Sequence, residues 1–189
     1  DYLLATGQCL VNLNGPNGGF TVNNGVIPIT SGCYGTANSK QFIAKFTNDL
    51  STISWQTSIG SGGAAFGYDF VPIAFMVDIC SHIYISGHGG MSLIPSMYTT
   101  PDAFYTNGGF YLMSLSPDAT SVEFATYYTE SHVDGGTSRF DPSGTIYQAV
   151  CSGGGFATTT NAYSQTQLGG WDIGVFKINF ELINIANIS

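Results

Sequence analysis

All-β is the fold class that the sequence predicts. Short runs that alternate apolar and polar residues, bounded by Gly, Pro, Asn and Asp, recur along the whole chain. No stretch combines a sustained 3.6-residue apolar period with helix caps. The same two kinds of hairpin also return at intervals, which is the signature of a repeat architecture.

The first kind of hairpin is clearest at 134–151. Its arms are joined by Asp141-Pro142-Ser143-Gly144, where Pro suits a φ near −65° and Gly suits a positive φ. Residues 73–90 have a similar first arm, an Asp-containing turn, an Ile-Tyr second arm and a glycine exit. Residues 1–7 resemble the second arm alone, so this copy is partial.

The second kind of hairpin alternates with the first. Residues 42–57 match 110–125, with Phe42 aligned on Phe110, and more loosely match 173–182. A Thr-rich segment with an aromatic residue, here called the lead, precedes each copy. The three leads centre on 28–30 with Tyr34, on 99–101 with Phe104, and on 158–160 with Tyr163.

Two hairpins per unit make four antiparallel strands, the content of one β-propeller blade. We therefore predict one propeller-like repeat region over 1–189. Rings of this kind normally take four to eight blades, so we expect a segment of a longer protein, or ends that pair with a partner. The predicted units are 1–8 (partial), 28–90, 99–155 and 158–189 (partial), with 9–27 as a loop excursion rich in Asn and Gly.

Composition excludes several classes of function. Charged residues make up 8% of the chain, aromatic residues 14%, and the formal net charge is −8. The aromatic content argues against disorder, and the acidic balance opposes nucleic acid and anionic membranes as partners. We find no apolar run of about 18 residues, so no transmembrane segment is expected.

The four cysteines, Cys9, Cys33, Cys80 and Cys151, have no C-x-x-C spacing, so a structural zinc site is not expected. A disulfide between Cys9 and Cys33 would staple the excursion between them in an exported protein. Buried thiols are the alternative, and sequence does not supply the geometry that decides between them.

Catalytic residues are not evident. The three histidines are not accompanied by a Gly-x-Ser-x-Gly elbow, so a hydrolytic triad is not expected. Glu123 and Glu130 could serve as paired carboxylates for glycoside cleavage. Four aspartates recur at equivalent turns, where Asp binds its own backbone, which is a structural use. They are Asp49, Asp78, Asp118 and Asp141.

Metal candidates are weak, and no cofactor is expected. Asp134 and Asp141 could offer oxygen ligands to calcium, but the chain has no D-x-D-x-D-G loop. His88, His132 and Asp134 could form a transition-metal site if their loops converge. Loop histidines without a metal are commoner.

Aromatic side chains are the stronger binding signal. Those in leads or at strand ends could face a sugar or a protein, although they could equally fill gaps between neighbouring blades. The candidates are Tyr98, Phe104, Tyr105, Tyr127, Tyr128, Tyr163 and Trp171.

Residues 41–46, 83–90, 132–141 and 146–151 resemble a known family, the secreted and cell-surface β-propeller-repeat (SBBP-like) proteins of Bacteroidetes. That family is associated with gliding motility and type IX secretion. The resemblance implies an extracellular or outer-membrane-associated protein. It implies no known reaction, and the PKD and sorting modules that often accompany the family are not found in this sequence.

The sequence leaves two candidate functions. The first is a non-catalytic extracellular module of a larger secreted protein, acting in cell-surface structure, adhesion or assembly with other chains or with the remaining blades. The alternative is a secreted glycan-binding or glycan-hydrolysing fragment.

Overall fold

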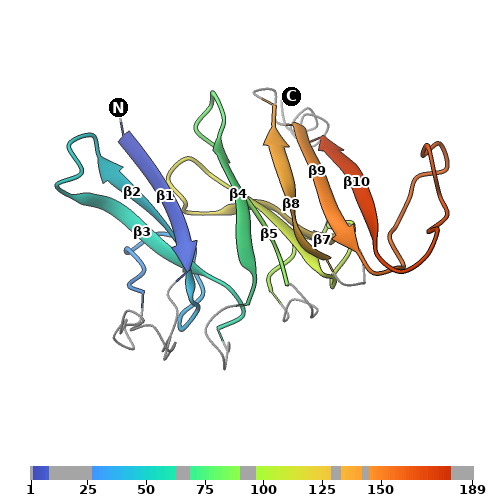
Figure 1. Cartoon of the computed structure of the whole chain (residues 1–189). Helices are drawn as coiled ribbons and strands as arrows, with labels where there is room; N and C mark the ends of the chain where they lie inside the picture. The colour runs from blue at the N-terminus through green and yellow to red at the C-terminus, as the bar shows by residue number, and fades with distance from the viewer. Residues whose placement is uncertain are drawn as a thin grey trace, which may run out of the picture.

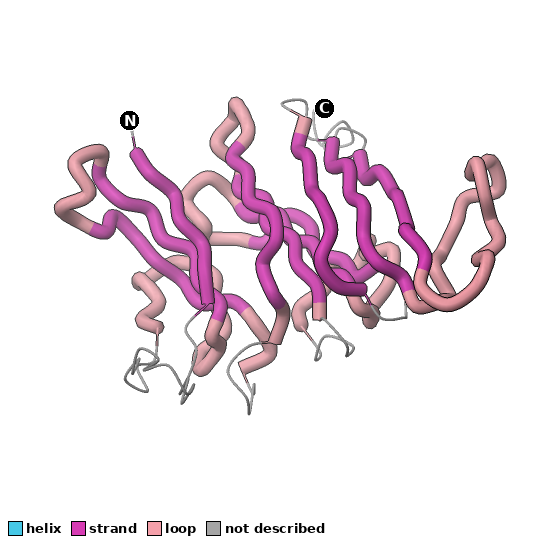
Figure 2. The backbone as a smooth tube through the Cα atoms, in the orientation of Figure 1, coloured by secondary structure: helices cyan, strands magenta, loops and turns pink. Residues whose placement is uncertain are grey.

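The computed structural model describes residues 2–8, 27–62, 69–89, 97–128, 133–141 and 145–179, with the backbone alone for 2–8, 133–138 and 140. Across these residues the chain is all-β, and no helix is present that could cross a membrane (Figure 2). The strands are β1 (Tyr2–Gln8), β2 (Gln41–Thr47), β3 (Ile53–Ile59), β4 (Val71–Val77), β5 (Ile83–His88), β6 (Phe110–Leu115), β7 (Val122–Tyr128), β8 (Val133–Phe140), β9 (Thr145–Ser152) and β10 (Asp172–Asn179).

The strands form three antiparallel sheets in chain order. Sheet A is β1-β2-β3, sheet B is β4-β5-β6-β7, and sheet C is β8-β9-β10. Figure 1 shows the three sheets next to one another in a row, with sheet B between sheets A and C. The first strand of each sheet lies near the next sheet's first strand, through β1–β4 and β4–β8 contacts. Among the described residues the three sheets do not close into a ring.

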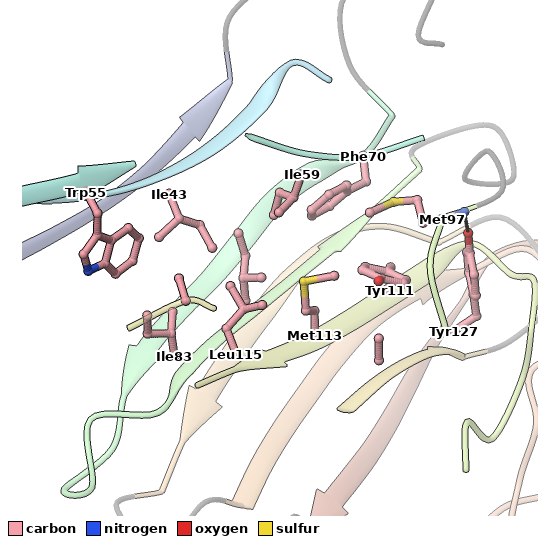
Figure 3. Packing of buried hydrophobic residues seen from close by; sticks show 13 residues of the cluster. Ile43, Trp55, Ile59, Phe70, Ile83, Met97, Tyr111, Met113, Leu115 and Tyr127 are labelled. Carbon is pink, nitrogen blue, oxygen red and sulfur yellow. Dashed lines mark hydrogen bonds between the residues drawn. The ribbon is translucent and has the colours of Figure 1, made fainter. Parts of the chain in front are cut away.

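Two hydrophobic cores hold the sheets together. The core between A and B includes Ile43 and Trp55 from sheet A and Tyr111, Met113 and Leu115 from sheet B (Figure 3). The core between B and C is built by the opposite face of sheet B. Its members are Tyr84, Phe110, Leu112, Phe124, Ile146, Val150, Phe176 and Ile178. Since sheet B is covered on both faces, every residue of β5 and β6 is buried.

The β2–β3 and β6–β7 turns are the same structure. In both, an aspartate accepts the backbone N–H two residues on, Ser51 N–H to Asp49 Oδ1 and Thr120 N–H to Asp118 Oδ1. In both, the following residue has a positive φ, 59° at Leu50 and 55° at Ala119. The structural use of Asp49 and Asp118 is confirmed.

The β4–β5 and β8–β9 turns form the other pair. Asp78 N–H donates to His82 O at 3.1 Å, and Asp141 N–H donates to Thr145 O at 2.7 Å. Within the first turn, Asp78 also accepts the backbone N–H groups of Cys80 and His82, each at 2.8 Å. Two kinds of hairpin therefore alternate, as the sequence predicts.

The leads cover sheet edges. Thr30 N–H donates to Gln56 O of β3, and Gln56 N–H donates back to Thr30 Oγ1, both at 2.9 Å. Thr100 makes the same reciprocal pair with Ala125 of β7, at 3.0 and 3.2 Å. The first and second leads thereby satisfy backbone groups that an outermost strand would otherwise leave open.

Two sequence expectations need correction. The predicted units 28–90 and 99–155 each combine two hairpins that belong to different sheets. The hairpin at 71–88 shares a sheet with the hairpin at 110–128, because β5 pairs with β6, and it does not share one with the hairpin at 42–59. The alignment of Phe42 on Phe110 is also displaced by one residue. The shared turns align Asp49 with Asp118 and hence Phe42 with Tyr111. The excursion at 9–27 and the strand expected at 183–188 lie outside the described residues, apart from Ile27.

Candidate functional site

The outward face of sheet C is an exposed apolar β-surface, here called face C. Along β10 the side chains alternate, with Phe176 and Ile178 packed on sheet B and Ile173 and Val175 on the other side, 79% and 72% exposed. Trp171 packs against Gly153 of the neighbouring strand end on this side. Face C is defined by Tyr147, Trp171, Ile173, Val175 and Lys177.

Two basic residues lie on this side of sheet C: Lys177, which is placed over an aromatic ring, and the exposed Arg139 of β8, which pairs with Tyr147. The Lys177 ammonium lies 5.4 Å from the centre of the Tyr147 ring. This cation–π geometry keeps the Lys177 charge at the aromatic side chain and leaves Ile173 and Val175 as the apolar middle of the face. Ile173 and Val175 are therefore adjacent exposed apolar side chains on one face of β10.

Strand pairing shows which residues of sheet B occupy the positions that form face C in sheet C. Ile83 follows the β4–β5 turn and pairs with Leu115, whereas Ile146 follows the β8–β9 turn and pairs with Ile178. Counting back from these pairs, Ile173 corresponds to Phe110 and Val175 to Leu112. Tyr147 likewise corresponds to Tyr84. The three counterparts in sheet B are all buried, because sheet C covers them.

Sheet A presents the complementary half at the other end of the stack, here called face A. By the same alignment, Phe42 and Phe46 of β2 correspond to Tyr111 and Leu115, which pack on sheet A inside the chain. Phe42 and Phe46 are partly buried and are not members of the two cores, and Phe42 makes a further contact of its own. Each end of the stack therefore offers one half of an interface that the chain makes internally twice.

A cleft of about 1030 Å³ lies between β10 and the third lead. Its walls include Phe156, Tyr163 and Leu168 from the lead side and Asp172 and Phe176 from β10. In sheet B the corresponding space between β6 and the lead at 100–105 holds β7. We therefore attribute this cleft to strand placement in the repeat and not to a ligand.

The structure separates the seven aromatic candidates. Tyr127 is fully buried, and its hydroxyl accepts the Met97 N–H at 2.7 Å (Figure 3), so it is a core residue and not a surface binder. Tyr128 stacks on Phe176 at 4.3 Å between sheets B and C, and Tyr105 packs edge-on to Tyr128. These three fill gaps between sheets, which is the alternative that the sequence left open.

The other four aromatic candidates are exposed but dispersed. Tyr98 lies 5.9 Å from Tyr34 between ring centres, and Phe104 packs edge-on to Phe124 at 5.8 Å. Tyr163 is fully exposed in the third lead. Trp171 is the one candidate that joins face C.

A second cluster lies at the β4–β5 turn, where Asp78, Cys80 and His82 place one ligand atom each within 4.8 Å of one another. Asp78 Oδ2 accepts the Tyr84 hydroxyl at 3.0 Å and lies 3.0 Å from His82 Nδ1. On the other side of the imidazole, His82 Nε2 lies 3.4 Å from Glu123 Oε1. The histidine is thus held between two carboxylates.

The environment shifts two pKa values in this cluster. Burial raises the pKa of Asp78, but the hydrogen bonds from His82 and Tyr84 outweigh it and hold the pKa below its usual range. Burial, followed by the bond to Asp78, raises the pKa of Tyr84. Near neutral pH the cluster therefore holds a carboxylate beside a protonated phenol.

Of the metal candidates His88, His132 and Asp134, the structure describes the side chain of His88 alone. His88 is buried in β5, Asp134 lies in β8, where the backbone alone is described, and His132 lies outside the described residues. Cys33 is a partly buried free thiol, and Cys9, the other half of the possible disulfide, lies outside the described residues.

The structure describes one member of the carboxylate pair considered for glycoside cleavage. Glu123 faces His82 and accepts the Ser114 hydroxyl at 3.3 Å, whereas Glu130 lies outside them. The site that sequence reasoning missed is Asp78, Cys80 and His82. Its signal was the D-x-C-x-H spacing, which brings alternate residues of one tight turn together.

Comparison with protein-family models, curated proteins and solved structures found no match. Fold and site define the class of this protein as an all-β chain of stacked antiparallel sheets with an open apolar end face.

Proposed function

We propose that this chain is a non-catalytic assembly module of the β-propeller type, in which face C receives a further β-sheet from a second copy of the chain. The observation that carries the proposal is the correspondence of Ile173 and Val175 with the buried Phe110 and Leu112. Phe110 and Leu112 of sheet B are buried because sheet C covers them, whereas the described residues place no further sheet on Ile173 and Val175 of sheet C.

The occupant follows from the contacts inside the chain. Sheet C covers sheet B through Ile146, Val150, Phe176 and Ile178, all apolar. Face A offers Phe42 and Phe46 at the positions by which sheet B covers sheet A. A second copy therefore brings a face that already has the matching pattern, and association is head to tail.

Head-to-tail contacts between copies produce either a closed ring or an open filament. Two copies of a three-sheet stack would give six sheets, which falls within the four to eight blades of closed propellers. Closure removes both exposed faces at once, whereas contacts that fail to close produce filaments. The resemblance of residues 41–46, 83–90, 132–141 and 146–151 to secreted Bacteroidetes repeat proteins supports a role for this assembly at the cell surface or outside the cell, in surface structure or adhesion.

The experiment is a complementation by two variants, read by sedimentation velocity. Ile173→Glu disables face C and leaves face A intact, and Phe46→Glu does the reverse. We expect the unaltered chain to associate as concentration rises and each variant to remain monomeric. An equimolar mixture of the two variants should form a 1:1 complex through the one intact pair of faces.

Ile79→Glu is the matched control, because Ile79 is 93% exposed at the β4–β5 turn, away from face C. This variant should associate like the unaltered chain. Failure of the unaltered chain to associate at any accessible concentration would refute the second copy as occupant. Association of Ile173→Glu by itself would show that face C is not involved.

A further inference from the structure

The β4–β5 turn contains two residues that its backbone does not require. The corresponding turn between β8 and β9 closes with the same bond, Asp141 N–H to Thr145 O, as Asp78 N–H to His82 O. In sequence, Ser143 stands where the first turn has Cys80, and Thr145 where it has His82. A hairpin of this repeat therefore forms with Ser and Thr at these positions.

The two carboxylate oxygens of Asp78 have different partners. Oδ1 accepts the backbone N–H groups of Cys80 and His82, which is the structural task of a turn aspartate. Oδ2 points to His82 Nδ1, 3.0 Å away, and also accepts the Tyr84 hydroxyl. An oxygen with two lone pairs can keep the tyrosine bond and offer the other pair to a cation.

The three ligand atoms suit one metal ion. A carboxylate oxygen of Asp78, Sγ of Cys80 and a ring nitrogen of His82 lie within 4.8 Å of one another, and Cys80 is exposed to solvent. Zinc takes carboxylate oxygen, imidazole nitrogen and thiolate sulfur at about 2.0 to 2.3 Å in tetrahedral sites. Any two ligand atoms of a tetrahedral ion with such bonds are about 3 to 4 Å apart, so a small movement of the three groups toward one another would complete the set.

A neighbouring strand supplies the orienting partner for the histidine. Glu123 of β7 places Oε1 3.4 Å from His82 Nε2, and Ser114 of β6 donates to its other oxygen at 3.3 Å. Metal-binding histidines regularly donate their second N–H to a carboxylate, which fixes the tautomer and directs the other nitrogen to the metal. Here that arrangement directs Nδ1 toward Asp78 and Cys80.

We propose that Asp78, Cys80 and His82 bind one zinc-type divalent ion at the β4–β5 turn, with Glu123 orienting His82. The fourth position is open to water, because the turn is at the surface. A borderline-soft ion fits this mixed oxygen, nitrogen and sulfur set better than calcium or magnesium, which prefer oxygen alone. The inference is independent of face C and of the proposed assembly.

Cobalt is the probe, since Co²⁺ substitutes for Zn²⁺ and reports thiolate ligation by a charge-transfer absorption. Reduced protein titrated with Co²⁺ should show this absorption saturating at one ion per chain, and Zn²⁺ should abolish it. The double variant Cys80→Ser/His82→Thr carries the side chains of the β8–β9 turn at both positions. It should keep the unaltered circular dichroism and melting temperature and lose the absorption.

Two single variants complete the experiment. Glu123→Ala should keep the absorption but weaken Co²⁺ binding about 10- to 100-fold, as for other orienting partners. Cys33→Ser, which alters a thiol outside the cluster, should behave as the unaltered chain. Absence of the absorption from the unaltered protein would overturn the proposal. So would its persistence in a Cys80→Ser variant.

Discussion

Phe110 and Ile173 occupy the same place in successive sheets, yet Phe110 is fully buried and Ile173 is 79% exposed. Each is the first residue of its strand, β6 or β10, whose side chain points away from sheet A along the stack, and both side chains are large and apolar. The difference lies in what covers them, since sheet C lies on Phe110. Exposure of the second is therefore a property of the position in the stack and not of the residue.

Leu112 and Val175 give the first prediction, because they are the matched pair next along the same strands. Leu112→Ala should lower the free energy of unfolding by about 2 to 5 kcal/mol, since it opens a cavity between sheets B and C. Val175→Ala in dilute, monomeric protein should change it by no more than about 0.5 kcal/mol. Urea denaturation measures both values. Equal losses in the two variants would contradict the alignment of the sheets.

Trp171 gives an optical prediction, because it is one of two tryptophans and the one on face C. Association should bury its ring, so its emission should move to shorter wavelength and its quenching by acrylamide should fall as concentration rises. Trp55 already lies in the core between sheets A and B and should not respond.

Trp171→Phe is the control for this measurement, since the remaining emission then comes from Trp55 alone. The variant should show no dependence on concentration. A shift that persists in Trp171→Phe would place the changing environment elsewhere than face C.

The hairpins could be predicted from the sequence because their determinants are local. Asp49 and Asp118 are hydrogen-bonded by residues two positions away, and alternating side chains follow each turn. Which hairpins share a sheet depends on the pairing of β5 with β6 across the long connection 89–109. No local residue specifies that pairing, so the predicted units divided the chain at the wrong place.

The candidate sites could be predicted in part. Aromatic content identified Trp171 but could not distinguish it from Tyr127, because burial depends on which face of a strand meets the next sheet. Cys80 and His82 were visible as D-x-C-x-H with Asp78. Their significance required comparison with the turn at Asp141, whose equivalence appears from the backbone hydrogen bonds.

Asp49 gives a prediction for the dependence of stability on pH. Hydrogen bonds from Thr47 and then from Ser51 lower its pKa from 3.8 to about 2. Because the folded-state pKa is depressed, the stabilisation is complete above pH 3.8 and is lost as pH falls through about 2. Urea denaturation at a series of pH values in this window should show unaltered protein losing stability more steeply than Asp49→Asn. Parallel profiles would show that the turn does not bind the ionised carboxylate.

Ser86 and Gly87 are adjacent in β5 and should respond in opposite directions to alanine. A Cβ on Gly87 would meet the Phe70 ring and the Val71 carbonyl oxygen, so Gly87→Ala should cost about 1 to 3 kcal/mol or more. The Ser86 hydroxyl is buried and has no hydrogen-bond partner among the described residues. Ser86→Ala removes that unsatisfied group and should stabilise the protein by up to about 1 kcal/mol. Thermal denaturation of the two variants compares them directly, and a tolerated Gly87→Ala would mean that β4 and β5 do not approach as closely as the structure shows.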